Sequence, residues 1–281
     1  MSDSDSDSYS DDDSHTRAPE GGGALHEAVR KLDVDAVRRA LAAGASADVL
    51  DDAGRTPLYI VCSDSENIDI IFGDGFNFGG DDEAGKWNGR ARERSAIVDA
   101  LLAAGANVHI ECGDDSMTPL QCAVWDGGGA PCDIVGMLIA AGADIEAGHF
   151  FDDEHAARCP LLYLAAQRGS AKTVAELIAA GANPHRRMIS GPGHTVMEGA
   201  APMHNFRVYP HLLRAGLALP PVENRNAYLT KVAATPGGFK AYEKEHRRRL
   251  TAVFADKFPA LPVEVISHIV LLLGHCGKYL Y

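Results

Sequence analysis

Aromatic and basic residues are scarce in this chain. Phe, Trp and Tyr make up 7% of its 281 residues, whereas hydrophobic residues as a whole make up 46%. A core of small side chains suits stacked short helices, so we expect one elongated domain. Lys and Arg number 26 and Asp and Glu 39, which gives a formal net charge of -13. Because binding to a phosphate backbone needs clustered cations, nucleic acid is not an expected partner.

The six cysteines lack the spacing of a metal site or a redox pair. They form no C-x-x-C pair, and no group of Cys and His has zinc-finger spacing, so reduced thiols are expected. Signal-peptide features are also missing, since the N-terminus is acidic and has no apolar core. The longest apolar run, residues 269–273, is too short to span a bilayer. These absences predict a soluble cytoplasmic or nuclear protein without a membrane partner.

Catalytic and cofactor-binding motifs are absent from the sequence. It contains no G-x-S-x-G, H-E-x-x-H, P-loop or kinase signature. The glycine run 127–129 lacks the Lys that would hold phosphates, and Asp74, Asp81 and Asp82 do not have calcium-loop spacing. We therefore expect no enzyme, no cofactor, no metal site and no small-molecule substrate.

The first twenty residues alternate Ser with Asp and offer almost nothing that a core could bury. Ordering such a segment costs entropy without a compensating gain, so residues 1–20 are predicted to be a disordered acidic tail. Its Ser residues resemble acidophilic kinase sites, whose phosphorylation would deepen the charge. The alternative is a solubilising tail without a regulatory role.

A motif ending in Leu/Ile-x-x-Gly-Ala is the clearest positive signal. It ends at Gly44, Gly105, Gly142 and Gly181, with a weaker copy at Gly216. Two copies run 21 positions from motif start to glycine, from Gly23 to Gly44 and from Pro160 to Gly181. The second and third copies run 49 and 24 positions, which indicates insertions of 28 and 3 residues. Self-similarity at this period predicts a solenoid.

Each copy carries start and stop signals for two short helices. Thr56-Pro57 and Thr118-Pro119 place a capping hydroxyl before a Pro that has no amide to leave unpaired. The second helix has apolar residues at helical spacing, as in residues 97–102. The glycine then ends it in a left-handed cap.

These residues resemble the ankyrin repeat, with its Thr-Pro-Leu-His-x-Ala-Ala start and Leu-Leu-x-x-Gly-Ala end. The His of that start is kept as His26 and His204 and replaced by Tyr59, Gln121 and Tyr163. The resemblance implies an all-α solenoid of about five helix-pair repeats over residues 22–217, with finger loops between repeats and a helical C-terminal segment. The predicted units are 22–50, 51–112 with an insertion near 63–94, 113–147, 155–187 and an irregular closing unit 198–220. The insertion is a binding loop or a decoration of the array.

The resemblance also implies a binding surface made of four finger loops and the first helices. We name the loops fingers one to four: residues 45–55, 106–117, 143–159 and 182–200. Finger three carries an aromatic and acidic cluster suited to a basic partner: His149, Phe150, Phe151, Asp152, Asp153 and Glu154. Finger four carries the basic residues Arg186 and Arg187. The alternative is that the Phe pair packs back on the helices and that the charges are merely solvated.

A different segment, residues 221–281, follows the repeats, with helical stretches near 227–233, 239–254 and 262–273. Its Leu-Pro-Val-Glu-Val-Ile sequence at 261–266 is similar to the opening of an F-box. That similarity implies docking on a ubiquitin-ligase adaptor through Leu261, Pro262, Val265, Ile266 and Ile269. The alternative is a plain helix that caps the last repeat.

Together, these patterns favour a non-catalytic adaptor that binds a protein partner through its fingers and first helices. The second hypothesis is a substrate receptor of a ubiquitin ligase, recruited through the C-terminal segment. A third, from another class, is a repressor that occupies the active site of an enzyme.

Overall fold

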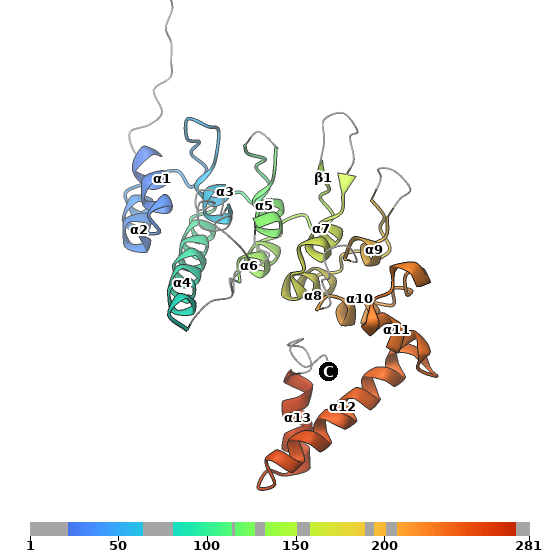
Figure 1. Cartoon of the computed structure of the whole chain (residues 1–281). Helices are drawn as coiled ribbons and strands as arrows, with labels where there is room; N and C mark the ends of the chain where they lie inside the picture. Colours follow the sequence, from blue (N-terminus) through green and yellow to red (C-terminus); the bar gives the residue numbers. More distant parts are fainter. Residues whose placement is uncertain are drawn as a thin grey trace, which may run out of the picture.

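The computed structural model describes residues 22–63, 81–113, 116–126, 133–150, 158–188, 194–200 and 207–273 (Figure 1). This part of the chain is helical apart from one antiparallel pair of two-residue strands, β1 (His149–Phe150) and β2 (Arg158–Cys159). The predicted all-α class is therefore confirmed. The tail predicted at 1–20 lies outside the described residues.

Ten of the described helices form two rows (Figure 1). The inner row is α1 (Gly22–Arg30), α3 (Pro57–Cys62), α5 (Pro119–Asp126), α7 (Leu161–Arg168) and α9 (Val196–Ala200). The outer row is α2 (Val34–Ala42), α4 (Asp81–Ala103), α6 (Ile134–Ala140), α8 (Ala171–Ala179) and α10 (Tyr209–Arg214). Each helix contacts the next one in its row, and each inner helix contacts the outer helix that follows it. Among the described residues, five helix pairs thus stand side by side.

One leucine position repeats at the centre of the inner row. Leu25, Leu58 and Leu120 are fully buried, and Leu162 is nearly so. In the outer row Leu101, Leu138 and Leu177 are fully buried in the same way. Each such leucine contributes about 1.5–3 kcal/mol through burial, and each is buried partly by the neighbouring pair. The core is therefore one continuous cluster along the stack.

The predicted start and stop chemistry is present. Thr56 accepts a hydrogen bond from the amide of Tyr59 at 3.2 Å, and Thr118 accepts one from the amide of Gln121 at 3.3 Å. The motif glycines all have positive φ, with +92° at Gly44 and +98° at Gly181. These values confirm the predicted left-handed ends of the outer helices.

Helix α4 is much longer than its counterparts, with 23 residues against 9 in α2 and α8. Its first part, residues 81–94, falls within the predicted insertion 63–94, whereas residues 64–80 lie outside the described residues. Arg94 is buried on this extension and donates to the carbonyl oxygen of Val61 through Nε and Nη2, at 3.0 and 2.7 Å. The extension therefore satisfies an end carbonyl of α3.

The fifth pair begins earlier than the sequence suggested. The closing unit was predicted to begin at residue 198, whereas α9 starts at Val196. The reason is a capping box: the amide of Thr195 donates to Glu198 Oε2 at 2.7 Å, and the amide of Glu198 donates to Thr195 Oγ1 at 3.2 Å. The backbone bond of Thr195 is the main cause that lowers the pKa of Glu198. His204 lies outside the described residues.

The C-terminal segment consists of a short 3-10 turn (Val222–Asn224), α11 (Ala227–Ala234), α12 (Gly238–Lys257) and α13 (Val263–Leu273). Tyr228 joins it to the stack, because its ring stacks on Tyr209 at 6.3 Å and meets the edge of Tyr242 at 5.6 Å. Arg214 of α10 adds an ion pair with Glu243 of α12 at 2.5 Å. From this joint α12 runs away from the stack, and α13 folds back along it (Figure 1).

Candidate functional site

The fingers follow the glycine caps in an ordered way. The second residue after each cap glycine accepts a side-chain hydrogen bond from the amide two residues further on, a turn that short polar side chains favour. The four acceptor and amide pairs are Ser46 with Asp48, Asn107 with His109, Asp144 with Glu146, and Asn183 with His185, at 2.9–3.3 Å. The same turn therefore opens every finger.

Neighbouring fingers are bonded to one another through these turns. The amide of Asn107 donates to Asp48 Oδ1, and the amide of Asn183 donates to Glu146 Oε1, both at 2.8 Å. We call these two bonds the finger ladder. Between the second and third fingers, where His109 replaces the acid, the described residues form no such bond. The ladder fixes the spacing of fingers one and two, and of fingers three and four.

Side chains of the inner helices also bond to the fingers. They stand at the position that is His in the ankyrin motif. His26 Nε2 lies 3.1 Å from the carbonyl oxygen of Arg55 in the first finger. Gln121 Nε2 donates to the carbonyl oxygen of Gly148 in the third finger at 3.0 Å. Gln121 thus makes the same kind of bond as His26, although the sequence analysis did not assume that it would.

The two tyrosines at this position pack closely against glycines. A methyl group added to Gly113 would lie 2.8 Å from the Tyr59 hydroxyl, and one added to Gly199 would lie 2.6 Å from the Tyr163 ring. Each tyrosine therefore packs against a glycine backbone at a distance that no side chain on that residue would allow. Tyr at the position of the motif His thus packs closely against the unit that follows.

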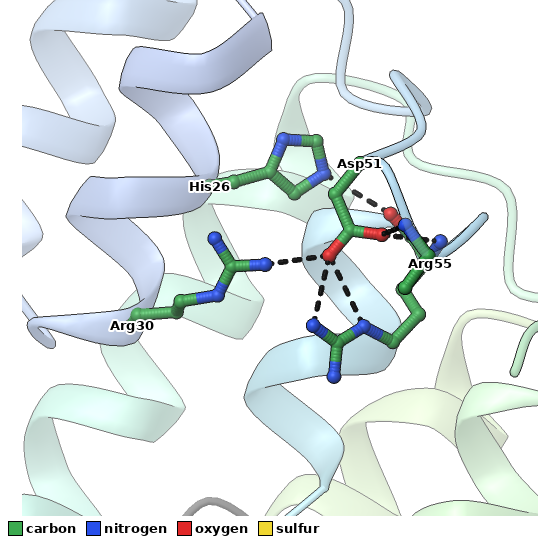
Figure 2. Close-up of polar contacts among 5 residues, drawn as sticks. His26, Arg30, Asp51 and Arg55 are labelled. Atoms are coloured by element: carbon green, nitrogen blue, oxygen red, sulfur yellow. Dashed lines mark hydrogen bonds and ion pairs between the residues drawn. The ribbon is translucent and has the colours of Figure 1, made fainter.

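A charged cluster supports the first finger (Figure 2). Asp51 accepts from Arg30 at 2.5 Å and from Arg55 at 3.0 Å, and its side chain is only 8% exposed. Its other oxygen accepts from the amides of Ala53 and Arg55, at 3.0 and 2.8 Å. Burial raises the pKa of Asp51, but the hydrogen bonds from Arg55 outweigh it, so that the pKa lies below its ordinary value. The cluster is part of the architecture that holds the finger.

The structure describes only part of the predicted site on finger three. His149 and Phe150 form strand β1, which pairs with Arg158 and Cys159. Phe151, Asp152, Asp153 and Glu154 lie outside the described residues. The paired strands β1 and β2 thus close the base of finger three, and a role of this cluster in binding a partner stays a prediction.

The two basic residues of finger four have different surroundings. Arg186 donates to the carbonyl oxygen and to Oε2 of Glu146, each at 2.6 Å. It therefore joins finger four to finger three next to the ladder bond of Asn183. Arg187 is exposed, as is His185. Of the two arginines, Arg187 is thus the more exposed.

A further pair of residues, not predicted from the sequence, lies on the inner row. The guanidinium carbon of Arg168 in α7 stands 3.9 Å from the ring centroid of Trp125 in α5. Trp125 is half-buried and Arg168 is exposed. Trp and Arg are the residues most enriched at binding hot spots. The signal available in the sequence was that each lies near the end of its inner helix, one repeat apart.

Reactive groups do not converge on this surface within the described residues. No group of three or more His, Cys, Asp and Glu there could hold a metal ion. Cys62, Cys112, Cys122 and Cys159 are buried and form no disulfide with one another. Burial raises the pKa of Cys159 to about 12, so this thiol is a poor nucleophile at neutral pH.

The residues predicted to dock on a ligase adaptor divide into two groups. Leu261, Pro262 and Val265 are exposed. Ile266 is 1% exposed, and Ile269 is half-buried. One face of residues 261–269 thus packs against α12 through Ile266, and the other face is exposed.

Comparison with known proteins gives one partial match. No family model matches the chain. Over 165 residues the chain is 33% identical to transient receptor potential cation channel subfamily A member 1 of Drosophila melanogaster. This match covers 58% of the chain and 11% of the relative, so the chain spans about a tenth of that protein. Throughout the described ranges, every helix is too short or too polar to cross a bilayer.

Proposed function

We propose that this chain is a non-catalytic adaptor of the ankyrin-repeat type, which binds a protein partner through its fingers and inner row. The observation that carries the proposal is the pairing of an ordered finger array with an exposed Arg168 stacked on Trp125. Rigid loops cost little entropy on binding. A stacked aromatic and guanidinium pair offers a hot spot of the usual composition.

The repeat assignment is supported by the two rows of paired helices and by the glycine caps. The partial similarity to the channel protein agrees with a repeat segment that occurs in larger proteins.

The test compares binding of partners by matched variants of the full chain. Tagged protein captures partners from a lysate, and the captured proteins are identified by mass spectrometry. We expect Arg168→Ala, and separately Phe150→Ala with Phe151→Ala, to remove a partner that the unaltered protein retains. Arg38→Ala, at an exposed position of α2 in the outer row, should retain it. Equal capture by all variants, with unchanged circular dichroism, would contradict the proposal.

The second candidate is a substrate receptor of a ubiquitin ligase. It is favoured by the exposure of Leu261 and Val265, at 39% and 44%. The burial of Ile266 weighs against it, because docking through that side chain would require α13 to leave α12. The test is capture of a ligase adaptor by the full chain and its loss on Leu261→Ser with Val265→Ser. Absence of any adaptor from the captured proteins would remove this candidate.

A further inference from the structure

The hairpin of α12 and α13 encloses a groove that no part of the finger surface uses. Its volume is about 660 Å³, which is within the range of ligand sites in proteins. The amino-terminal end of α12 is held by Arg214 and Tyr228, and the rest of the hairpin projects from the stack (Figure 1). The groove therefore lies outside the described stack of helix pairs, which leaves it accessible from that side.

One end of the groove is strongly basic. Lys240, Lys244, Arg247 and Arg248 line it, and their spacing places them on one face of the helix. Lys240 and Lys244 are exposed and have no partner among the described residues. This is a marked exception in a chain of formal net charge -13.

The carboxylates nearby do not neutralise this end. Glu243 lines the groove but is already paired with Arg214 at 2.5 Å, and it lies 3.4 Å from Arg247. Glu245 bonds both Arg248 and Arg249, at 2.9 and 3.0 Å. A surplus of positive charge therefore remains on the lysine side.

The other end of the groove is apolar. Ala252 and Ala255 of α12 and Val263 of α13 line it. Val263 is 57% exposed, and Phe258 and Leu261 beside it in the sequence are 48% and 39% exposed. Cations at one end and apolar side chains at the other suit a ligand with acidic residues followed by apolar ones.

We propose that this groove binds an acidic peptide segment of another protein, with carboxylates against Lys240 and Lys244 and apolar side chains against Ala255 and Val263. The chain's own Ser and Asp run offers the charge but not the apolar part, since Tyr9 is its one large apolar side chain between Ser2 and Ser14. The groove would thus act as a second interface, independent of the fingers.

The test is fluorescence anisotropy of the full chain with a fluorescein-labelled peptide in which glutamates are followed by leucines. Replacing Lys240→Gln with Lys244→Gln should weaken binding about tenfold or more, because it removes charge-assisted hydrogen bonds. The matched control, Arg249→Gln with Lys257→Gln, changes the net charge equally on the same helix outside the groove and should keep binding within about threefold. Val263→Ser should weaken the glutamate and leucine peptide but not an all-glutamate peptide.

Circular dichroism and the thermal midpoint must be unchanged in all three variants, which is expected at exposed positions. Equal weakening by both double variants would overturn the proposal, because it would show a response to net charge only. Absence of peptide binding at low salt would overturn it too. Equally tight binding of phosphatidylserine vesicles or of random RNA, with the same response to the lysine variants, would replace the peptide site with a general anion surface.

Discussion

The ring of Tyr163 lies against Gly199 so closely that a methyl group on Gly199 would stand 2.6 Å from it. This relationship ties α7 to α9, the last two helices of the inner row. We expect Gly199→Ala to lower the free energy of unfolding by about 1–3 kcal/mol, the usual cost of overpacking. Urea denaturation of the variant and of the unaltered protein measures this difference in the free energy of unfolding.

The control for this clash is Gly23→Ala in α1, where a methyl group would meet nothing within 4 Å. Because Ala favours helix more than Gly does, that change should leave stability unaltered or raise it by up to about 1 kcal/mol. In a Tyr163→Ala background the cost of Gly199→Ala should vanish. A cost that persists there would show that the ring is not its cause.

The buried cluster at the first finger gives a second prediction. Asp51→Asn keeps an acceptor for the amides but loses the charge that faces Arg30 and Arg55. We expect a loss of about 1–2 kcal/mol, since hydrogen bonds to charged groups are the stronger ones. The exposed pair of Glu27 and Lys31 is the comparison, and Glu27→Gln should leave the free energy of unfolding nearly unchanged, because solvent screens an exposed ion pair. An equal loss in both variants would contradict this role of Asp51.

The lowered pKa of Asp51 predicts a specific dependence on pH. The unfolded state binds a proton more readily than the folded state, so the free energy of unfolding rises with pH. The contribution is complete above the unfolded value of about 4 and is lost as the pH falls through the lower folded pKa. Chemical denaturation at a series of acidic pH values should show this fall. Asp51→Asn should flatten it, and an unchanged slope would assign the acid sensitivity to other carboxylates.

Arg94 is expected to matter far more than its neighbour on α4. Arg94→Met removes both bonds to the carbonyl oxygen of Val61, which leaves a buried acceptor unsatisfied at a cost of about 1–3 kcal/mol. Arg92→Met changes an exposed residue and should stay within about 0.5 kcal/mol. Thermal denaturation of both variants decides the matter, and equal midpoints would show that the buried bonds add no stability.

The link between fingers three and four makes a local prediction. Arg186→Gln removes the ion pair with Glu146, whereas Arg187→Gln leaves the ladder bond and its support in place. Hydrogen exchange of the amides of Asn183 and His185 should therefore be faster in Arg186→Gln than in Arg187→Gln. Equal rates in the two variants would show that Arg186 does not stabilise the finger.

Much of the local structure followed from short-range chemistry that the sequence displays. Thr56 followed by Pro57, and the glycines that end the outer helices, specify backbone conformations independently of distant residues. The start of α9 lies ahead of the predicted unit 198–220, because the capping box of Thr195 and Glu198 sets it. The box was visible in the sequence as Thr-x-x-Glu.

The contacts between repeats were harder to predict because they join residues far apart in the chain. Asp48 and Asn107 are 59 positions apart, and the insertion between them hides their common register. The sequence alone did not predict that Gln121 would bond to a finger carbonyl as His26 does, since many side chains can fill that position. The groove beside α12 depends on the angle at which α13 returns, which spacing along one helix does not determine.

The finger ladder sets a rule for changing the length of this array. Removing one repeat of a bonded pair of fingers would leave the remaining finger with either a carboxylate or a backbone amide that has lost its ladder partner. At His109 the series is already interrupted, so a unit could be inserted between fingers two and three without separating either bonded pair. That junction is the natural place to splice this protein.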